Sequence, residues 1–208
     1  MNWDLYVVTD EGLSRGKTHA EIAEEAVRGG AGVIQLREKS KESREIFEDA
    51  CKIADICRDK AVFIVNDRLD IALAAGADGV HLGQSDIPLT EARKIAPKPF
   101  IIGISVGSVE DADEAVANGA DYIAVSPVFD TGSKKDAGKG HGLALVQEIR
   151  AKYPDIPLIG IGGLNKTNVA DAVHAGLDGI AVISAVVSQE NIAESAKELL
   201  TVIKEAKK

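Results

Sequence analysis

Cysteine is scarce in this chain of 208 residues, which contains only Cys51 and Cys57. Both lie in a segment with helical periodicity, and neither has the histidine or cysteine partners at the spacing that a zinc site requires. We therefore expect two buried or unreactive free thiols and no zinc centre.

Long apolar runs and an excess of positive charge are also absent. No stretch approaches the roughly 18 apolar residues of a membrane-spanning helix, and the opening segment MNWDLYVVTD lacks the regions of a signal peptide. Lys and Arg number 24 against 33 Asp and Glu, a net charge of -9, which argues against general binding to nucleic acid or anionic membranes. We expect a soluble cytoplasmic protein that binds any anionic partner locally.

Short apolar runs rich in Val and Ile alternate with longer segments of helical period, which is the pattern of βαβ units. The runs are LYVVTD, GVIQLRE, VFIVND, DGVHLG, FIIGIS, DYIAVS, PLIGIGG and DGIAVIS. Eight such units close a parallel barrel, and a (βα)₈ barrel of roughly 200 to 250 residues commonly forms one domain. No Pro- or Ser-rich linker divides the chain, so we expect residues 1–208 to be a single α/β domain.

A short sequence echo precedes every second predicted strand. It reads GGAGVI, AGADGV, NGADYI and AGLDGI at residues 29–34, 75–80, 118–123 and 175–180. Each copy places glycine where a helix should end and an apolar strand directly after it. Such repetition favours a barrel built from paired βα units over a doubly wound sheet.

Polar residues gather where the predicted strands end, which is the face that carries the active site of such barrels. In QLREK, Gln35, Arg37 and Lys39 share one parity and would project to the same side if the strand continues. Two cations and an amide suit a phosphate, and Lys134 and Lys135 in the polar loop 129–142 would add positive charge at this rim. The alternative is a pair of solvated charges at a strand end.

Two carboxylates follow neighbouring strands close to these cations. Asp67 ends the third predicted strand, and Asp86 follows the fourth. Mg²⁺ binds one or two carboxylates together with phosphate oxygens, so this pair predicts a magnesium site. Alternatively, Asp67 caps the following helix and Asp86 belongs to a polar turn before Pro88.

A second anion site is indicated where the seventh and eighth strands end, in GIGGLN (160–165) and AVISA (181–185). Glycines that leave backbone N–H groups open, followed by a helix, form the phosphate site often found there in barrels. No GxSxG nucleophile motif occurs. His81 lies near a strand end, where either a direct chemical role or a structural hydrogen bond is open.

Taken together, these segments resemble the thiamine-phosphate synthase family over nearly the whole chain. The resemblance is carried by LYVVTD, VIQLREK, FIVNDRLDIALAAGADGVHLGQSD, IIGIS, SPVFDTGSKKD, LIGIGG and GIAVISA, in the family's order. It implies a (βα)₈ barrel that joins hydroxymethylpyrimidine diphosphate to a thiazole phosphate, with or without an extra carboxylate, and releases pyrophosphate. The family's reaction is described as dissociative and assisted by Mg²⁺.

The resemblance also implies a role for each matching residue. Gln35 would bind the pyrimidine, and Ser105 would help to orient the diphosphate. The diphosphate would be held by Arg37, Lys39, Asn66 and Lys134. Mg²⁺ would be bound by Asp67 and Asp86. The thiazole phosphate would be received by Thr131, Ser133, Gly163, Ile183 and Ser184. Four of these, Arg37, Lys39, Ser105 and Lys134, would act directly in catalysis.

Departures from the family pattern are modest. Ser126 stands before Pro127 where glycine is common, Asp130 where proline is frequent, and Ser133 where threonine is frequent. A thiazole tautomerase of the same fold usually carries histidine after the serine of the fifth strand, whereas Val106 follows Ser105 here. Two further functions compete with synthesis: a sugar-phosphate isomerase or epimerase on the same barrel, and a non-catalytic binder of the thiamine pathway. The expected partners are small molecules, with the oligomeric state left open.

Overall fold

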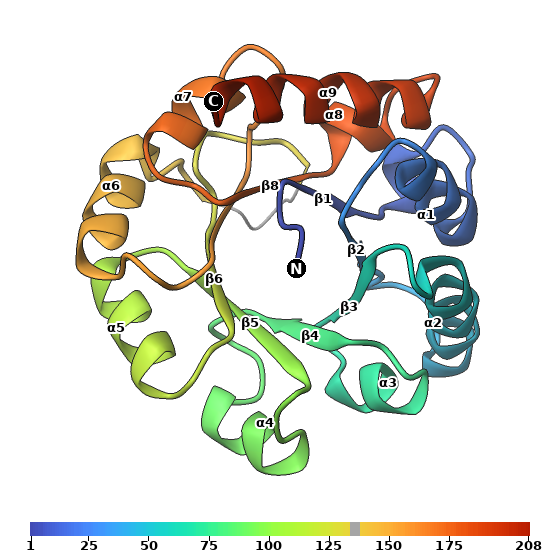
Figure 1. Ribbon diagram of the computed structural model, residues 1–208. Coiled ribbons are helices and arrows are strands. Elements are labelled where there is room, and N and C mark those ends of the chain that lie inside the picture. The colour runs from blue at the N-terminus through green and yellow to red at the C-terminus, as the bar shows by residue number, and fades with distance from the viewer. Residues whose placement is uncertain (134–137) are drawn as a thin grey trace.

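Eight parallel strands form a closed barrel in chain order in the computed structural model, which describes residues 1–133 and 138–208 (Figure 1). The strands are β1 (Leu5–Val8), β2 (Val33–Leu36), β3 (Val62–Asn66), β4 (Gly79–Leu82), β5 (Ile101–Val106), β6 (Tyr122–Val125), β7 (Leu158–Ile161) and β8 (Gly179–Val182). Pairing of β8 with β1 closes the sheet, so no strand edge is left open. The predicted (βα)₈ barrel is confirmed.

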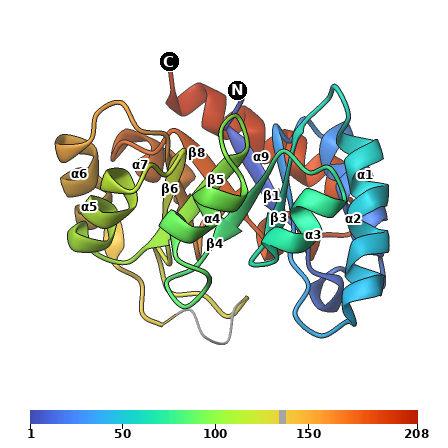
Figure 2. The same cartoon turned by 90° about the horizontal axis from the view of Figure 1, so that it is seen from below.

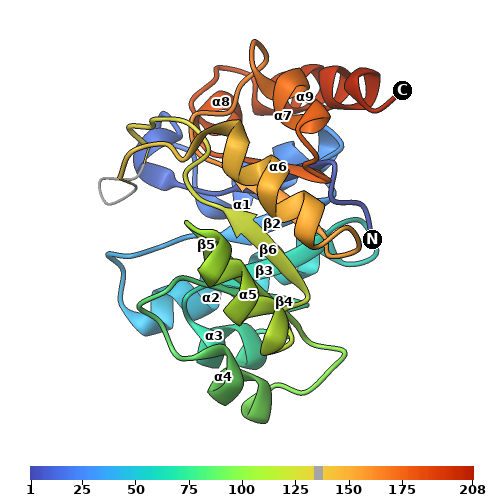
Figure 3. The same ribbon diagram turned by 90° about the vertical axis from the view of Figure 1, so that its left-hand side faces the viewer.

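Helices cover the outside of the barrel. They are α1 (His19–Arg28), α2 (Ser43–Cys57), α3 (Leu69–Ala74), α4 (Leu89–Ile95), α5 (Val109–Ala117), α6 (Gly142–Lys152), α7 (Val169–His174), α8 (Ser184–Val187) and α9 (Ile192–Ala206), with a 3₁₀ turn, η1 (Glu11–Leu13). Figure 3 shows α4, α5 and α6 on the outer surface. Strands enclosed in this way are buried on both faces, which explains their continuous apolar runs.

The sequence echo has a structural reason at the N-terminal end of the barrel. Its glycines Gly30, Gly76, Gly119 and Gly176 all have positive φ and follow helices α1, α3, α5 and α7. In three copies, the aspartate side chain two residues later accepts a hydrogen bond from a backbone N–H at the start of the preceding strand. These bonds join Asp78 to Phe63 (2.7 Å), Asp121 to Ile102 (2.8 Å) and Asp178 to Leu158 (2.8 Å). In these copies, the echo therefore joins the residue just before β4, β6 or β8 to the start of β3, β5 or β7.

Both chain termini lie at this same end, opposite to the loops that follow the strands (Figure 2). Lys207 near the C-terminus forms an ion pair of 2.5 Å with Asp4, just before β1. The C-terminal rim of the barrel is thus left to the βα loops.

The two thiols lie on α2, as predicted. Cys51 is half-buried, Cys57 is buried, and neither is in a disulfide. Burial raises the pKa of Cys57 to about 12, so its reactive thiolate is scarce at neutral pH.

Candidate active site

The two predicted metal ligands meet at the C-terminal rim. Asp67 directly follows β3 and adopts a left-handed backbone with φ of 62°, a conformation that is uncommon outside glycine and that clusters at functional sites. Its N–H donates to the carbonyl of His81 on β4 (2.9 Å), which fixes the strained residue between two strands. Arg68, not Asp67, occupies the N-cap position of α3, so the helix-cap alternative for Asp67 is wrong.

The carboxylates of Asp67 and Asp86 face each other. The pKa of Asp67 lies above its usual value because the carboxylate is buried and because the negative charge of Asp86 faces it, while Lys39 opposes the shift. Lys39 Nζ lies 3.4 Å from Asp67 Oδ2. The turn alternative for Asp86 also holds, since its Oδ2 accepts the N–H of Gly83 (2.7 Å). Hard oxygen ligands that repel one another fit a divalent cation.

Arg37 and Lys39 reach this rim by different paths from the one that parity suggested. Strand β2 ends at Leu36, so the alternation does not extend to these two residues. Arg37 Nη1 instead pairs with Asp10 Oδ2 after β1 (3.1 Å), and its side chain is only 13% exposed. Lys39 is half exposed and points to Asp67. Of these two cations, Lys39 contacts the carboxylate pair directly, and Arg37 is held by the loop after β1.

Gln35, Asn66 and Ser105 lie on the strands themselves. Gln35 and Asn66 are buried, at 3% and 8% exposure, and Ser105 is half-buried near the end of β5. Gln35 Nε2 donates to the hydroxyl of Tyr6 (2.6 Å), and Ser105 Oγ lies 2.9 Å from His81 Nε2. These three polar groups lie at or near the C-terminal ends of β2, β3 and β5.

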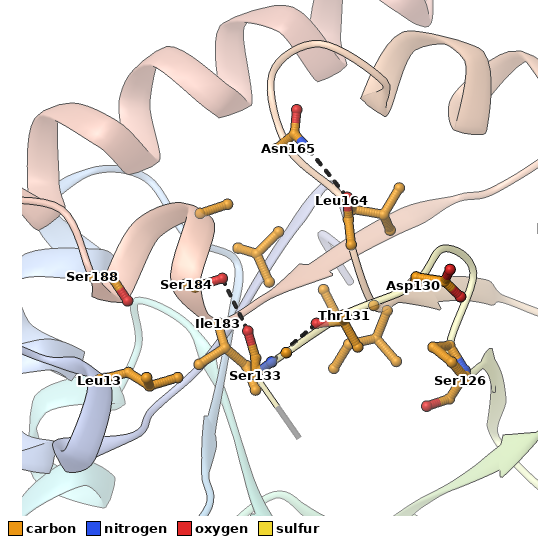
Figure 4. A pocket seen from close by; sticks show the side chains of 18 of the residues that line it. Leu13, Ser126, Asp130, Thr131, Ser133, Leu164, Asn165, Ile183, Ser184 and Ser188 are labelled. Atoms are coloured by element: carbon orange, nitrogen blue, oxygen red, sulfur yellow. Dashed lines mark hydrogen bonds between the residues drawn. The ribbon is translucent and has the colours of Figure 1, made fainter. Parts of the chain in front are cut away.

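The second predicted anion site is a cavity of about 600 Å³ at the ends of β6, β7 and β8 (Figure 4). All five residues expected to receive the thiazole phosphate line it: Thr131, Ser133, Gly163, Ile183 and Ser184. Ser133 Oγ and Ser184 Oγ are 3.0 Å apart, joining the loop after β6 to the first residue of α8 (Figure 4). The short helix α8 was not predicted as a separate element, because four residues give no readable helical period.

The backbone of the β7–α7 loop adds close packing to this cavity. Gly162 and Gly163 have φ of 102° and 65°. A Cβ at Gly163 would lie 2.7 Å from the carbonyl oxygen of Asp130 and from Cβ of Phe129, so any side chain would clash with the β6–α6 loop. Glycine is thus required at 162 and 163 by conformation, and at 163 also by space.

Lys134 lies outside the described residues, as does the adjoining segment 135–137. The remaining predicted residues divide into the rim around Asp67 and the cavity around Ser184. They come from the ends of six strands and from the β6–α6 loop. The six strands are β2, β3, β4, β5, β7 and β8.

Two groups at the barrel mouth and interior were missed by sequence reasoning. The first is a cluster of Glu11, His19 and Glu38. Each residue offers one atom that could bind a metal, and these atoms lie within 4.8 Å of one another. The carboxylates of this cluster already hold Lys41 (2.9 Å from Glu11) and the Ser40 N–H (2.6 Å from Glu38), which explains it as an ion-pair network. The second comprises the buried hydroxyls of Tyr6 and Tyr122. A tyrosine in an apolar strand needs a hydrogen-bond partner for its hydroxyl, and this need could have indicated from the sequence that the two residues belong to a polar group inside the barrel.

Comparison with known proteins identifies the family. The sequence model of the family described as thiamine monophosphate synthase matches residues 5–186. The chain belongs to this family. A thiamine-phosphate synthase of Methanoculleus marisnigri is 55% identical over 208 residues, covering 100% of this chain and 98% of the relative.

Solved structures agree with membership in the thiamine monophosphate synthase family. A thiamine phosphate pyrophosphorylase from Pyrococcus furiosus superposes with a TM-score of 0.90 at 42% identity, covering 99% of this chain and 97% of the other. A 3-hexulose-6-phosphate synthase, with a TM-score of 0.72 and 19% identity over 96% and 99% of the two chains, shares the fold alone. Across residues 1–133 and 138–208, no helix has the length and apolar character needed to cross a membrane.

Proposed function

We propose that the chain joins 4-amino-2-methyl-5-hydroxymethylpyrimidine diphosphate to a thiazole phosphate, forming thiamine phosphate and pyrophosphate. The observation that carries the proposal is the presence of two polar clusters of different chemistry at one rim. One combines cations with a carboxylate pair, and the other is a cavity lined by hydroxyls and glycine backbone. Two phosphorylated substrates of unequal charge suit two such sites.

In the proposed reaction, the bond between the pyrimidine methylene carbon and the diphosphate oxygen breaks first. Pyrophosphate leaves with the electron pair, the electron-rich aminopyrimidine stabilises the resulting cation, and the lone pair of the thiazole nitrogen forms the new C–N bond. Arg37 and Lys39, together with Lys134 as the sequence predicts, would stabilise the leaving group by charge. Holding both reactants at one rim of the barrel would supply the orientation.

Mg²⁺ is the proposed cofactor, and Asp67 and Asp86 would hold it. The facing carboxylates, and the pKa of Asp67 that burial and then the charge of Asp86 raise, fit a divalent cation better than a purely structural pair. When bound, the ion would neutralise charge on the departing diphosphate. Gln35 would hold the pyrimidine, Asn66 and Ser105 the diphosphate, and the five cavity residues the thiazole phosphate.

The test supplies both phosphorylated precursors with Mg²⁺ and measures thiamine phosphate and pyrophosphate. We expect the two products in equal amounts, and none after chelation of the metal. Asp67→Asn should lower turnover at least about 100-fold, because it weakens metal binding at the leaving group. Its matched control is Asp70→Asn, three residues away, where the exposed carboxylate pairs with Arg68 and turnover should stay normal.

Binding of both precursors without product would favour a non-catalytic binder, and turnover that persists without metal would contradict the magnesium assignment. Full activity of Asp67→Asn would contradict the assignment of that ligand. The single-domain organisation, the cytoplasmic location and any homo-oligomeric assembly stay predictions.

A further inference from the structure

Five polar side chains form a continuous row of hydrogen bonds across the interior of the barrel. Gln35 Nε2 lies 2.6 Å from Tyr6 Oη, which lies 3.0 Å from Tyr122 Oη. Tyr122 Oη is 2.9 Å from His81 Nδ1, and His81 Nε2 is 2.9 Å from Ser105 Oγ. The row joins two residues of the proposed pyrimidine diphosphate site through three that have no assigned role.

The two tyrosines are built into the barrel interior. Tyr6 and Tyr122 are 2% and 0% exposed, and they come from strands β1 and β6, which are not neighbours in the sheet (Figure 1). Gly103 on β5 makes room for the second ring, since a Cβ there would lie 1.9 Å from Tyr122 Cζ. Burial raises the pKa of both phenols above the usual value, so each keeps its single proton.

With His81 neutral, the bonds of this row have two complete directions. A phenol between two neighbours donates to one and accepts from the other, and a neutral imidazole has one donor and one acceptor nitrogen. In the forward direction, donation runs from the Gln35 amide through both phenols to His81 Nδ1, and His81 Nε2–H donates to Ser105. In the reverse direction, Ser105 donates to His81 and every other bond reverses, ending on the amide oxygen of Gln35.

The two directions present opposite chemistry to a ligand. The forward direction leaves the amide oxygen of Gln35 free to accept and the hydroxyl proton of Ser105 free to donate. In the reverse direction, the amide oxygen of Gln35 accepts from Tyr6 and the hydroxyl of Ser105 donates to His81, so both groups are used inside the row. The amine of an aminopyrimidine is a donor and a diphosphate oxygen is an acceptor, so a bond from the amine to Gln35 and a bond from Ser105 to the diphosphate both require the forward direction.

We propose that Tyr6, Tyr122 and His81 are positioning residues that couple the two ends of the pyrimidine diphosphate site by fixing one direction of hydrogen bonding from Gln35 to Ser105. This inference rests on the proposed function for the identity of the substrate. Binding of an anion at Ser105 stabilises the orientation of Gln35 that recognises the amine, and binding of the amine stabilises the donor at Ser105. The coupling is reciprocal.

The first test determines the tautomer of His81 by ¹⁵N NMR on the wild-type protein, free and with Mg²⁺ and pyrophosphate. The forward direction predicts a proton on Nε2 and a bare Nδ1 in the complex. The signal is assigned by its loss in His81→Gln, because the chain has four histidines. A proton on Nδ1, or a mixture of tautomers in the complex, would overturn the proposal without reference to turnover.

The second test removes one hydroxyl at a time and separates the two ends. Tyr6→Phe frees the Gln35 amide, so KM for the pyrimidine diphosphate should rise about tenfold while the His81 tautomer is kept by Tyr122. Tyr122→Phe removes the donor to Nδ1, so the complex should show mixed tautomers and kcat should fall about tenfold. These sizes correspond to one hydrogen bond each.

The matched control is Tyr153→Phe, which deletes the same atom from the third tyrosine of the chain. Its hydroxyl donates to Asp113 on the outer surface, 2.5 Å away, and neither KM, kcat nor the tautomer should change. Thermal unfolding confirms that each variant is folded. If wild-type enzyme makes thiamine phosphate and Tyr6→Phe and Tyr122→Phe match it in KM, kcat and tautomer, the row is only structural and the proposed function stands.

Discussion

Replacing Asp86 with asparagine should stabilise the metal-free protein. Burial raises the pKa of Asp67, and repulsion from the facing carboxylate of Asp86 raises it further. Two charges roughly 4 Å apart repel by about 4 kcal/mol at an effective dielectric constant of about 20. Lys39 offsets much of this, and the 27% exposed Asp67 side chain is screened by solvent, which leaves a gain of about 0.5 to 1 kcal/mol. Asparagine keeps an oxygen for the Gly83 N–H.

The assay is thermal unfolding with and without Mg²⁺ and pyrophosphate. Without them, the Tm of Asp86→Asn should rise by about 1 to 4 °C at neutral pH. With both in excess, the wild type should overtake the variant, because ligand at about 100 times its Kd contributes about 2.7 kcal/mol. Asp113→Asn is the matched control: Lys152 and Tyr153 hold the pKa of Asp113 low, so this change should bring no gain and a normal response to metal.

The pH dependence gives the refuting result. Because the pKa of Asp67 is raised in the folded state, its ionisation destabilises the fold as pH rises through that pKa. The advantage of Asp86→Asn should therefore be present at neutral pH and vanish once acid protonates Asp67. A lower Tm for the metal-free variant at neutral pH, or an advantage that persists in acid, would refute the repulsion argument.

Two glycine substitutions test the close packing of the barrel. Gly163→Val places a branched side chain at φ of 65° against the Asp130 carbonyl, so affinity for thiazole phosphate, measured by calorimetry, should fall at least about tenfold; unchanged affinity would remove this loop from the site. Gly103→Ala forces the ring of Tyr122 to move and should cost about 1 to 3 kcal/mol in urea unfolding, whereas Gly132→Ala, which meets no atom within 4 Å, should cost far less.

Much of the fold could be predicted because two of its signals lie in neighbouring residues: the alternation of apolar strands with helical segments, and the glycines that end the helices. The echo glycine at Gly76 ends a helix and precedes β4, and both features follow from residues adjacent in sequence. The rim positions of Asp67 and Ser184 were also predictable, since every parallel strand ends at the same face.

The partners of the site residues could not be predicted in the same way. The end of β2 at Leu36 removed the parity that would have aligned Arg37 with Lys39. Their ion pairs with Asp10 and Asp67 depend on where neighbouring βα loops turn. Loop geometry depends on contacts that single-sequence patterns do not encode.

By itself, the sequence determined the eight alternating strands and helices, the rim that collects polar residues, and membership in a family read from motifs in order. Only the tertiary structure decided that Asp67 and Asp86 oppose each other and that Tyr6 and Tyr122 join Gln35 to Ser105. Tyr6 and Tyr122 are 116 residues apart in the chain, and their 3.0 Å hydrogen bond exists because barrel closure buries both hydroxyls in the interior, where polar groups bond to one another instead of to water.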